Sequence, residues 1–339
     1  MLEFYRMVRV KTIDAHAAGE PLRLIVDGFP SPRGRTMLEK REWVLNHADH
    51  LRRALMLEPR GHADMYGAIL TEPVSPGSHA GVLFMHNEGY STMCGHGVVA
   101  VTTMAIERDL IWPGGPNLVL DAPAGPVVAT PQVSEADGVR RVSSVAFRNV
   151  PSFVYEAALP VTLPGGRTLL VDIAFGGAFY AIVDAEAAGL AVDAAKLPEL
   201  RRLGTEVKLE VERLRQVVHP LDAGLKGIYG TIFTAPPRHA DAHLRNVTIF
   251  AEAEVDRSPC GTGTAAVMAV LSEMGVLGDD APFVHESIVG TTFSGRIVGR
   301  QQIADRPAIV PEISGSAWIT GEHTFLIDGE DPLKAGFRL

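Results

Sequence analysis

The hydrophobic and polar residues along the chain form two series of elements in the same order. In the first series, "VRVKTIDAHAAGEPLRLIVDGF" (residues 8–29) predicts two strands around the turn Gly19-Glu20-Pro21. Apolar residues recurring among charges from Thr36 onward predict a helix that Pro59-Arg60-Gly61 ends. Strands "YGAIL" and "AGVLFMHN" follow, then an apolar helix from Cys94 to about Leu110, and strands within residues 117–133.

The second series begins near Val142 and repeats this order. Strand-like runs occupy "VSSVAFRNVPSFVY" and "RTLLVDIAFGGAFYAIVD", a helical stretch covers Ala194–Val218, and strands return in "GIYGTIFT" and "LRNVTIFAEAEV". An apolar helix then runs from Cys260 to about Leu277. The repeated order predicts an α+β fold with two pseudo-symmetric lobes. We place the N-terminal lobe at residues 1–141 and about 325–339, and the C-terminal lobe at residues 142–324.

The two apolar helices begin with the same motif. "CGHGVVAVTTMAIERDLI" starts at Cys94 and "CGTGTAAVMAVLSEMGVL" starts at Cys260, and these are the two cysteines of the chain. Gly95 and Gly97 of the first segment align with Gly261 and Gly263 of the second, as expected for a diverged internal duplication. Two lobes that face one another would bring both thiols to one cleft.

Composition and charge narrow the class of protein. The 339 residues are 46% hydrophobic and 21% charged, which is enough apolar material for about two globular domains. A net charge of −9 argues against a nucleic-acid partner, and no apolar run is long enough to span a membrane. The N-terminal stretch lacks the apolar segment of a signal peptide, so the sequence predicts a cytoplasmic protein whose cysteines are thiols.

The Cys-Gly-x-Gly frame favours acid–base chemistry on a small carboxylate. A thiol just before a helix lies at the positive end of the helix dipole, which lowers its pKa. The adjacent glycines allow a ligand close to the backbone, whose N–H groups bind a carboxylate well. Two thiols flanking one Cα can remove a proton from one face and return one to the other, and no pyridoxal cofactor is required.

Other interpretations of the cysteines stay open from the residues alone. A lone buried cysteine is ordinarily a small hydrophobe, and a pair in one chain can form a redox disulfide. A metal site is not predicted, because four soft ligands are missing and His47 with His50 is typical of a solvated helix face. The repeated glycine-rich frame favours the catalytic interpretation.

At these residues the sequence resembles the proline racemase family, with its diaminopimelate-epimerase-like fold. The resemblance is carried by "MCGHG" (Met93–Gly97) and "DRSPCGTG" (Asp256–Gly263), with support from "HAAGEP", "PRGHADMYGA", "DIAFGGAFYA" and "SGSAWITG". It extends over nearly the whole chain. It implies that each lobe is a curved mixed sheet wrapped around a central helix, with the active site in the interlobe cleft.

The resemblance also implies roles for individual residues. Cys94 and Cys260 would be the two catalytic acid–base residues. His96 and Asp256 would hold the thiols and the substrate amine, and the backbone N–H groups of Gly95, His96, Gly261 and Thr262 would bind the carboxylate. Tyr66, Leu225 and Phe250 are largely apolar pocket candidates, which suit an unsubstituted pyrrolidine ring better than a 4-hydroxylated one.

Three interpretations of the site remain: a racemase or epimerase, a dehydratase, and a binding protein. A cysteine at position 260 favours a proline racemase or hydroxyproline 2-epimerase, because the trans-3-hydroxy-L-proline dehydratases of the family usually carry Thr or Ser there. The sequence around the motifs, "EPRGHADMYGA" and "GIYGTIFT" among others, is closer to the dehydratase branch. A binding protein that has lost turnover is the third alternative. The expected partner is a small-molecule substrate, proline or a hydroxyproline, and a homodimer is possible for the assembly.

Overall fold

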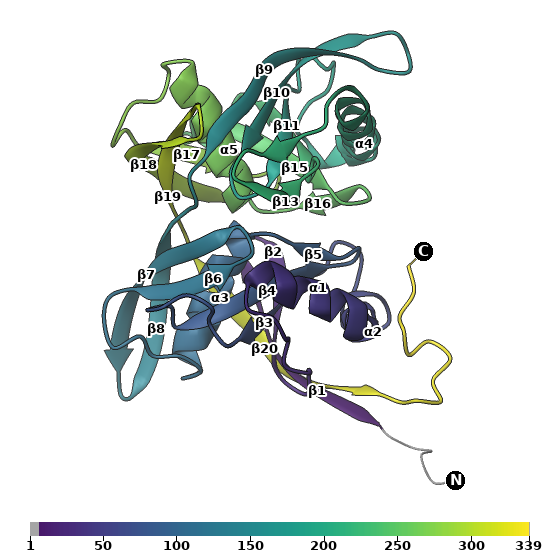
Figure 1. The fold of residues 1–339 in the computed structure, drawn as a ribbon, viewed down its shortest axis with the longest axis vertical. Coiled ribbons are helices and arrows are strands. Elements are labelled where there is room, and N and C mark those ends of the chain that lie inside the picture. The colour runs from purple at the N-terminus through teal and green to yellow at the C-terminus, as the bar shows by residue number, and fades with distance from the viewer. Residues whose placement is uncertain (1–6, 339) are drawn as a thin grey trace. The chain divides into compact units, whose positions relative to one another are not determined.

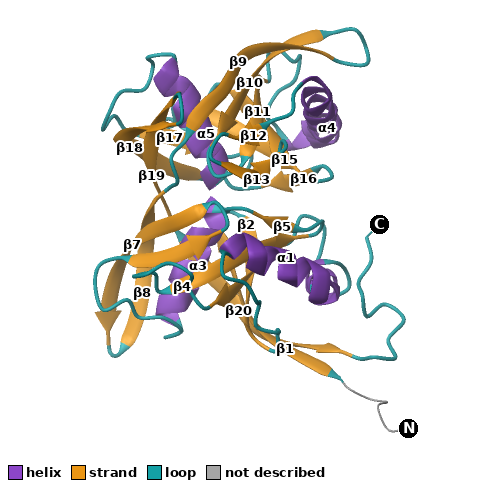
Figure 2. Cartoon of the chain, in the orientation of Figure 1, coloured by secondary structure: helices purple, strands orange, loops and turns teal. Residues whose placement is uncertain are grey.

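Strands make up most of the secondary structure, and few helices accompany them (Figure 2). The computed structural model describes residues 7–338. Residues 1–6, part of the N-terminal stretch in which no signal peptide is expected, and Leu339 lie outside the described residues. The chain divides into two units. The first contains residues up to Met93, Gly97–Val145 and the residues from Ser316 on, and the second contains Cys94–His96 and Ala146–Gly315.

The first unit is a mixed sheet closed by a strand from the far end of the chain. β1 pairs antiparallel with both β2 and β20, β2 runs parallel to β3, and β3 pairs antiparallel with β4. β4 then runs parallel to β6, which pairs antiparallel with β7, and β5 adds to β4. The strands are β1 (Val8–Ala17), β2 (Glu20–Asp27), β3 (Tyr66–Thr71), β4 (Ala80–His86), β5 (Tyr90–Ser91), β6 (Leu118–Ala122), β7 (Gly125–Ala136) and β20 (Ala317–Ile327).

The second unit repeats this arrangement. β10 pairs antiparallel with β9 and β11, β11 runs parallel to β14, and β14 pairs antiparallel with β15. β15 runs parallel to β17, β18 pairs antiparallel with β17 and β19, and β16 adds to β15. The strands are β9 (Phe153–Thr162), β10 (Thr168–Phe175), β11 (Phe179–Asp184), β14 (Gly230–Ala235), β15 (Leu244–Phe250), β16 (Glu254–Asp256), β17 (Phe283–Glu286), β18 (Thr292–Ile303) and β19 (Arg306–Gly315).

The order of antiparallel and parallel pairings is therefore the same in both units. Starting from β20 in one and β9 in the other, the pairings run antiparallel, antiparallel, parallel, antiparallel, parallel, antiparallel. β8 (Val139–Arg148) leads the chain from the first unit into the second (Figure 1). The predicted pseudo-symmetric α+β fold is confirmed by this repeated topology.

Each topology contains one buried helix that begins directly after a cysteine. α3 (Gly95–Glu107) and α5 (Gly261–Glu273) are equally long, and Gly95–Ile106 and Gly261–Val270 are buried throughout. A helix that is apolar all round must be covered on every side. In the second unit α5 packs on β9, β10 and β19. The sequence predicted both helices, and each ends about four residues earlier than predicted.

The remaining helices are only partly buried and lie outside the sheets. The single helix predicted from Thr36 is two, α1 (Met37–His47) and α2 (Asp49–Met56), because the backbone leaves the helical region at Ala48. Thr36 and Glu39 form a capping box that starts α1. In the second unit, a 3-10 turn (Ala194–Lys196) leads into α4 (Leu197–Leu214), which packs on β14 and β15. A small hairpin of β12 (Val218–His219) and β13 (Asp222–Lys226) follows.

Other expectations have mixed outcomes. Within residues 7–338, no helix is long and apolar enough to cross a membrane. Strands β17 to β20, which follow α5, were not predicted. Buried and exposed residues do not alternate regularly along residues 283–327. The lobe boundaries placed at residues 142 and about 325 stay a prediction; the described units change at Ala146 and Ser316.

Candidate active site

Cys260 is the N-cap residue of α5. Its backbone has φ 61° and ψ 108°, a region that residues other than glycine rarely adopt and that is enriched at functional sites. Its Sγ accepts a hydrogen bond from the Gly263 N–H at 3.3 Å, and its carbonyl accepts one from the Thr264 N–H at 2.7 Å. The thiol is 5% exposed. The start of the helix therefore fixes the sulfur beside backbone donors.

The residues just before Cys260 form a hydrogen-bonded turn. Asp256 ends β16, and its Oδ1 accepts from the Ser258 N–H at 2.8 Å and from the Ser258 hydroxyl at 2.7 Å. The Ser258 Oγ in turn accepts from the Cys260 N–H at 3.1 Å. The "DRSPCG" stretch is thus ordered by its own side chains, which hold the cysteine in its uncommon conformation.

A second set of hydrogen bonds holds the Pro259 carbonyl from behind. Thr264 Oγ1 and Asn246 Nδ2 both donate to this oxygen, each at 3.1 Å. Between them lies His285, whose Nε2 is 2.9 Å from Asn246 Nδ2 and whose Nδ1 is 2.9 Å from Thr264 Oγ1. Nε2 must accept from the amide, so Nδ1 carries the proton and donates to Thr264. Complete burial lowers the pKa of His285 to about 3, so the ring is neutral.

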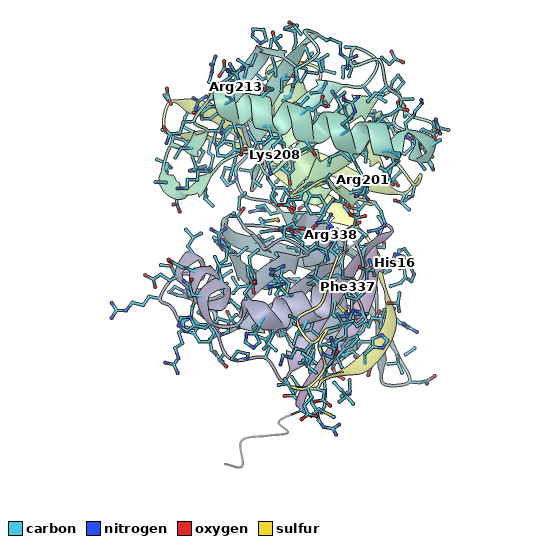
Figure 3. The ribbon with its side chains drawn as sticks, turned by 90° about the vertical axis from the view of Figure 1, so that its right-hand side faces the viewer. His16, Arg201, Lys208, Arg213, Phe337 and Arg338 are labelled. Carbon is cyan, nitrogen blue, oxygen red and sulfur yellow. The ribbon has the colours of Figure 1, made fainter. Side chains whose placement is uncertain are left out.

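Helix α4 supports the loop that precedes Asp256. Arg201 Nη1 donates to the Ala253 carbonyl at 2.7 Å, and Lys208 Nζ donates to the Ala251 carbonyl at 3.4 Å. Figure 3 shows both side chains on α4, together with Arg213. Ala251 and Ala253 have φ of 47° and 68°, so two cationic side chains stabilise a loop whose backbone is strained.

The first cysteine motif enters the second unit through Cys94–His96. His96 Nδ1 lies 3.3 Å from Cys94 Sγ and 4.0 Å from Asp256 Oδ2, so one ring nitrogen is shared by a thiol and a carboxylate. A Cβ added to Gly95 would lie 2.4 Å from the Gly261 Cα, and the reverse holds for Gly261. Only glycine allows the two backbones to approach this closely.

The electrostatics at Cys260 differ from the sequence prediction. A helix N-terminus was expected to lower the thiol pKa. In the structure, burial first and then the negative charge of Asp256 raise the pKa of Cys260 to about 12, while hydrogen bonds from Tyr180, the Gly263 N–H and Thr262 lower it. Desolvation outweighs the donors because the thiolate would be almost completely removed from water. Cys260 is therefore a protonated thiol, suited to donating a proton.

Tyr180 was not predicted as a site residue, yet it contacts the thiol. Its hydroxyl oxygen, on β11, lies 3.7 Å from Cys260 Sγ and 2.6 Å from Thr262 Oγ1. Thr262 Oγ1 is 3.8 Å from the same sulfur. Two hydroxyls and one sulfur thus form a triangle at the start of α5. The only sequence signal was the position of Tyr180 inside the quoted "DIAFGGAFYA" stretch.

The pocket candidates are placed in different elements. Phe250 ends β15 and stacks on Tyr229 at 5.4 Å, and Tyr229 meets Tyr180 edge to face at 5.7 Å, so an aromatic row leads to the thiol. Leu225 is buried in the β13 hairpin. Tyr66 is buried in β3 of the first unit, where its hydroxyl bonds Ser91. These three stay predictions as substrate contacts.

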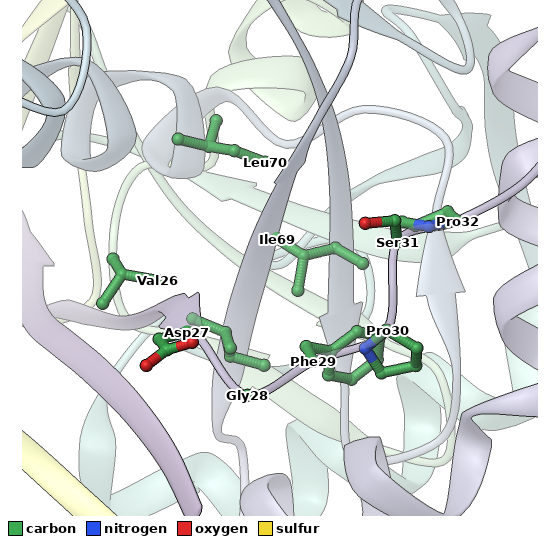
Figure 4. A pocket seen from close by; sticks show the side chains of 10 residues that line it. Val26, Asp27, Gly28, Phe29, Pro30, Ser31, Pro32, Ile69 and Leu70 are labelled. Atoms are coloured by element: carbon green, nitrogen blue, oxygen red, sulfur yellow. The ribbon is translucent and has the colours of Figure 1, made fainter.

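Figure 4 shows residues that line a cavity in the first unit. The cavity has a volume of about 240 Å³, and none of the predicted site residues lines it. The residues that line it are largely uncharged, and the carboxylate among them, Asp27, is paired with Lys11 at 3.5 Å. Among residues 7–338, no cluster of three or more His, Cys, Asp or Glu side chains could hold a metal ion.

Two copies of one strand-and-helix topology, each with a Cys-Gly-x-Gly frame at the start of its buried helix, define a class of two-thiol α+β proteins. The sequence model described as "Proline racemase" matches residues 12–338, and the chain belongs to the proline racemase family.

Three similar proteins illustrate the range of the family. The chain is 49% identical over 330 residues to a trans-3-hydroxy-L-proline dehydratase of Bacillus thuringiensis subsp. konkukian, covering 97% of each chain. It is 42% identical over 332 residues to a proline racemase of Clostridioides difficile, covering 97% of this chain and 98% of that one. A crystal structure of a hydroxyproline epimerase from Agrobacterium vitis with bound trans-4-hydroxy-L-proline superposes with a TM-score of 0.91 and 30% identity, covering 99% of this chain and 96% of that one. The relatives are thus racemase, epimerase and dehydratase enzymes.

Proposed function

We propose that this protein is a cofactor-independent racemase or epimerase that inverts Cα of proline or a hydroxyproline. The observation that carries the proposal is a cysteine in both Cys-Gly-x-Gly frames, Cys94 and Cys260. Inversion needs an acid–base group on each face of Cα, and a thiol in both frames supplies that pair. Relatives named proline racemase and hydroxyproline epimerase support it.

In the proposed mechanism, the thiolate of one cysteine takes the α-proton as the Cα–H bond breaks. The thiol of the other cysteine delivers its proton to the opposite face of Cα, and its sulfur becomes the thiolate. The two cysteines then have exchanged protonation states and are ready for the reverse direction. Because the pKa of Cys260 is raised to about 12, we assign it as the proton donor and Cys94 as the base at the start of the cycle.

The substrate carboxylate would be bound by the N–H groups of Gly95, His96, Gly261 and Thr262. N–H groups in the first turn of a helix have no intrahelical acceptor, so they can stabilise the negative charge that develops next to Cα. The carboxylate of Asp256, 4.0 Å from the His96 ring, would bind the substrate amine. A cytoplasmic location and a homodimer are further parts of this proposal, to be tested by fractionation and by light scattering.

A specific observation favours a second candidate, a trans-3-hydroxy-L-proline dehydratase. A relative with that name is 49% identical to this chain. In this reaction Cys94 would remove the α-proton, the C3–O bond would break, and the hydroxyl would leave as water after receiving a proton. The product is a cyclic imine formed from the enamine.

One panel of substrates separates the candidates. L- and D-proline, trans-4-hydroxy-L-proline, cis-4-hydroxy-D-proline and trans-3-hydroxy-L-proline are incubated with the protein in D2O. We expect inversion by polarimetry and α-deuterium incorporation by NMR for proline or a 4-hydroxyproline. Turnover of trans-3-hydroxy-L-proline alone, with an imine trapped by o-aminobenzaldehyde, would overturn the first proposal and support the second. A protein that binds a member of the panel but exchanges no α-proton is a binding protein.

A further inference from the structure

The surroundings of Cys260 oppose the thiolate form that the proposed reaction requires. In one direction of the proposed reaction Cys260 must act as a base, which requires its thiolate. Burial and the charge of Asp256 both oppose that form, and they raise the pKa of the thiol to about 12. At neutral pH few molecules would carry this thiolate. It also forms when Cys260 gives up its proton in the other direction, so donors directed at the sulfur affect the rate of inversion in both directions.

The donors available to the sulfur can be identified. The Gly263 N–H lies 3.3 Å from Sγ and is fixed by the helix. The Tyr180 and Thr262 hydroxyl oxygens lie at 3.7 and 3.8 Å. Among the titratable groups near this sulfur are Asp256 from β16 and Tyr180 from β11, and Tyr229 faces Tyr180.

The short contact between the two hydroxyls orients them. Tyr180 and Thr262 are 2.6 Å apart, so one hydrogen lies between their oxygens and the other is directed elsewhere. A phenol is a stronger donor than an alcohol, and a hydroxyl that accepts a hydrogen bond becomes a better donor itself. Either hydroxyl can donate in this contact. When the sulfur carries negative charge, the phenol as the stronger donor is expected to donate to it, while Thr262 donates to Tyr180. The Tyr180 side chain is completely buried, so water does not compete for this hydrogen.

We propose that Tyr180 is a further catalytic residue, whose phenolic hydrogen binds the Cys260 sulfur and stabilises its thiolate on one face of the substrate. The inference rests on the proposed function for its catalytic consequence. The hydrogen bond to the sulfur itself is independent of which substrate is turned over. In the two-thiol enzyme the loss of Tyr180 should slow inversion in both directions equally. In a protein with a single remaining cysteine it should slow exchange through Cys260 far more than exchange through Cys94.

The first test measures thiolate directly. In a Cys94→Ser background Cys260 is the single cysteine of the chain, and its rate of alkylation by iodoacetamide at a fixed pH follows the thiolate fraction. Tyr180→Phe should lower this rate roughly tenfold to a hundredfold between pH 7 and 10, the effect of losing a hydrogen bond to a charged group. Tyr155→Phe is the matched control, because it removes a phenol of the same unit that bonds the Gln216 carbonyl at 3.3 Å. An alkylation rate in Tyr180→Phe within twofold of its parent at every pH would overturn the proposal.

A second variant excludes a change of access or folding as the cause. Tyr180→3-fluorotyrosine keeps the shape of the side chain and makes its hydroxyl a stronger donor, so alkylation of Cys260 should become faster rather than slower. A slower or unchanged rate contradicts the proposal. Because this variant retains the hydroxyl and its partner Thr262, it remains informative if Tyr180→Phe does not fold.

The catalytic consequence is read from isotope exchange. In the Cys94→Ser background, deuterium wash-in at Cα of the enantiomer served by Cys260 should fall roughly tenfold to a hundredfold on Tyr180→Phe. In a Cys260→Ser background, Tyr180→Phe should change wash-in to the other enantiomer through Cys94 much less, because Tyr180 then acts on the site only through Thr262. Equal losses in both backgrounds contradict a role at Cys260. If wild-type protein exchanges no substrate of the panel, the proposed function fails, and the alkylation rates still decide on Tyr180.

Discussion

Cys260 meets two requirements with one sulfur atom. It accepts the Gly263 N–H as the N-cap of α5, and under the proposed function it also exchanges a proton with the substrate. A serine at this position is a good N-cap but a weak base without an adjacent activator. Substitution can therefore separate the structural role of the residue from its chemical role.

We predict that Cys260→Ser abolishes inversion of proline and of the 4-hydroxyprolines while the free energy of unfolding changes by less than about 1 kcal/mol. Polarimetry and urea denaturation measure the two effects. Exchange at Cα of one enantiomer should persist through Cys94. Cys260→Ala is the comparison, since it should also lose inversion but cost about 1 kcal/mol more for the missing cap. An enzyme that still inverts Cα after Cys260→Ser is not a two-thiol racemase.

His285 gives a prediction about pH. Its pKa is lowered from 6.5 to about 3 by burial, so between these values the unfolded chain binds a proton that the folded protein does not. The contribution of His285 to stability is complete above pH 6.5 and declines by about 1.4 kcal/mol per pH unit below it. The difference in free energy of unfolding between wild type and His285→Asn should shrink from pH 7 to pH 5. Denaturation curves at several pH values test this, and a constant difference would show that His285 titrates normally.

The site residues that lie within a short sequence motif could be predicted from the sequence. Those that come from distant strands could not. Cys94, His96, Asp256 and Cys260 lie within two short stretches, so their sequence neighbours indicate their role. Tyr180, Asn246 and His285 reach the same place from β11, β15 and β17, through strand pairings that join distant parts of the chain. The raised pKa of Cys260 was also hidden, because burial of one sulfur depends on how several elements pack around it.

At the scale of elements, the starts of the two central helices depend on the glycine that follows each cysteine. Gly95 and Gly261 leave no room for a Cβ on either backbone. The apolar helices themselves were predictable, since their hydrophobic residues are contiguous in sequence. The break at Ala48 in the first helical stretch was not, because no glycine or proline marks it.

We predict that Gly261→Ala displaces the start of α5 and lowers the free energy of unfolding by roughly 1 to 3 kcal/mol, with a larger loss of activity than of stability. The added Cβ would lie 2.4 Å from the Gly95 Cα, so backbone must move, and Cys260 is the adjacent residue. Urea denaturation and initial rates on the best substrate measure both effects. Gly278→Ala is the control: its added Cβ meets no atom within 4 Å, and it should change neither quantity appreciably. Full activity in Gly261→Ala would show that activity does not require the close approach of the Gly95 and Gly261 backbones.

At the scale of the whole molecule, the repeated pairing order identifies two copies of one topology in a single chain. The sequence predicted the duplication from the order of its elements and from the two thiol segments. It assigned residues from about 325 on to the N-terminal lobe, but it did not predict β20 or its pairing with β1 from Val8↔Ile327 to Ala17↔Ala317. Pairings between the two ends of a chain leave no local sequence signal.

We predict that a chain ending at Gly315 loses hydrogen-exchange protection in β1 and accumulates as insoluble protein, because the edge of β1 is left without its partner strand. A chain ending at Asp328 keeps β20 and should stay folded. It loses only the terminal segment, where the Phe337 N–H donates to the Glu58 carbonyl at 2.9 Å and Arg338 pairs with Glu88. Figure 3 labels Phe337 and Arg338. Protection of β1 in the Gly315 chain would contradict a structural role for β20.

Because β20 is synthesised long after β1, the pairing of these two strands also determines the order in which the two units can fold during translation. Ala317 is synthesised three hundred residues after its partner Ala17. At about 5 to 20 residues per second, the nascent chain exposes the unpaired side of β1 for roughly 15 to 60 s. Residues 146–315 emerge as one continuous stretch during that time, so the unit that begins the chain is the last to be completed. We expect chaperones to bind the nascent chain at the unpaired edge of β1.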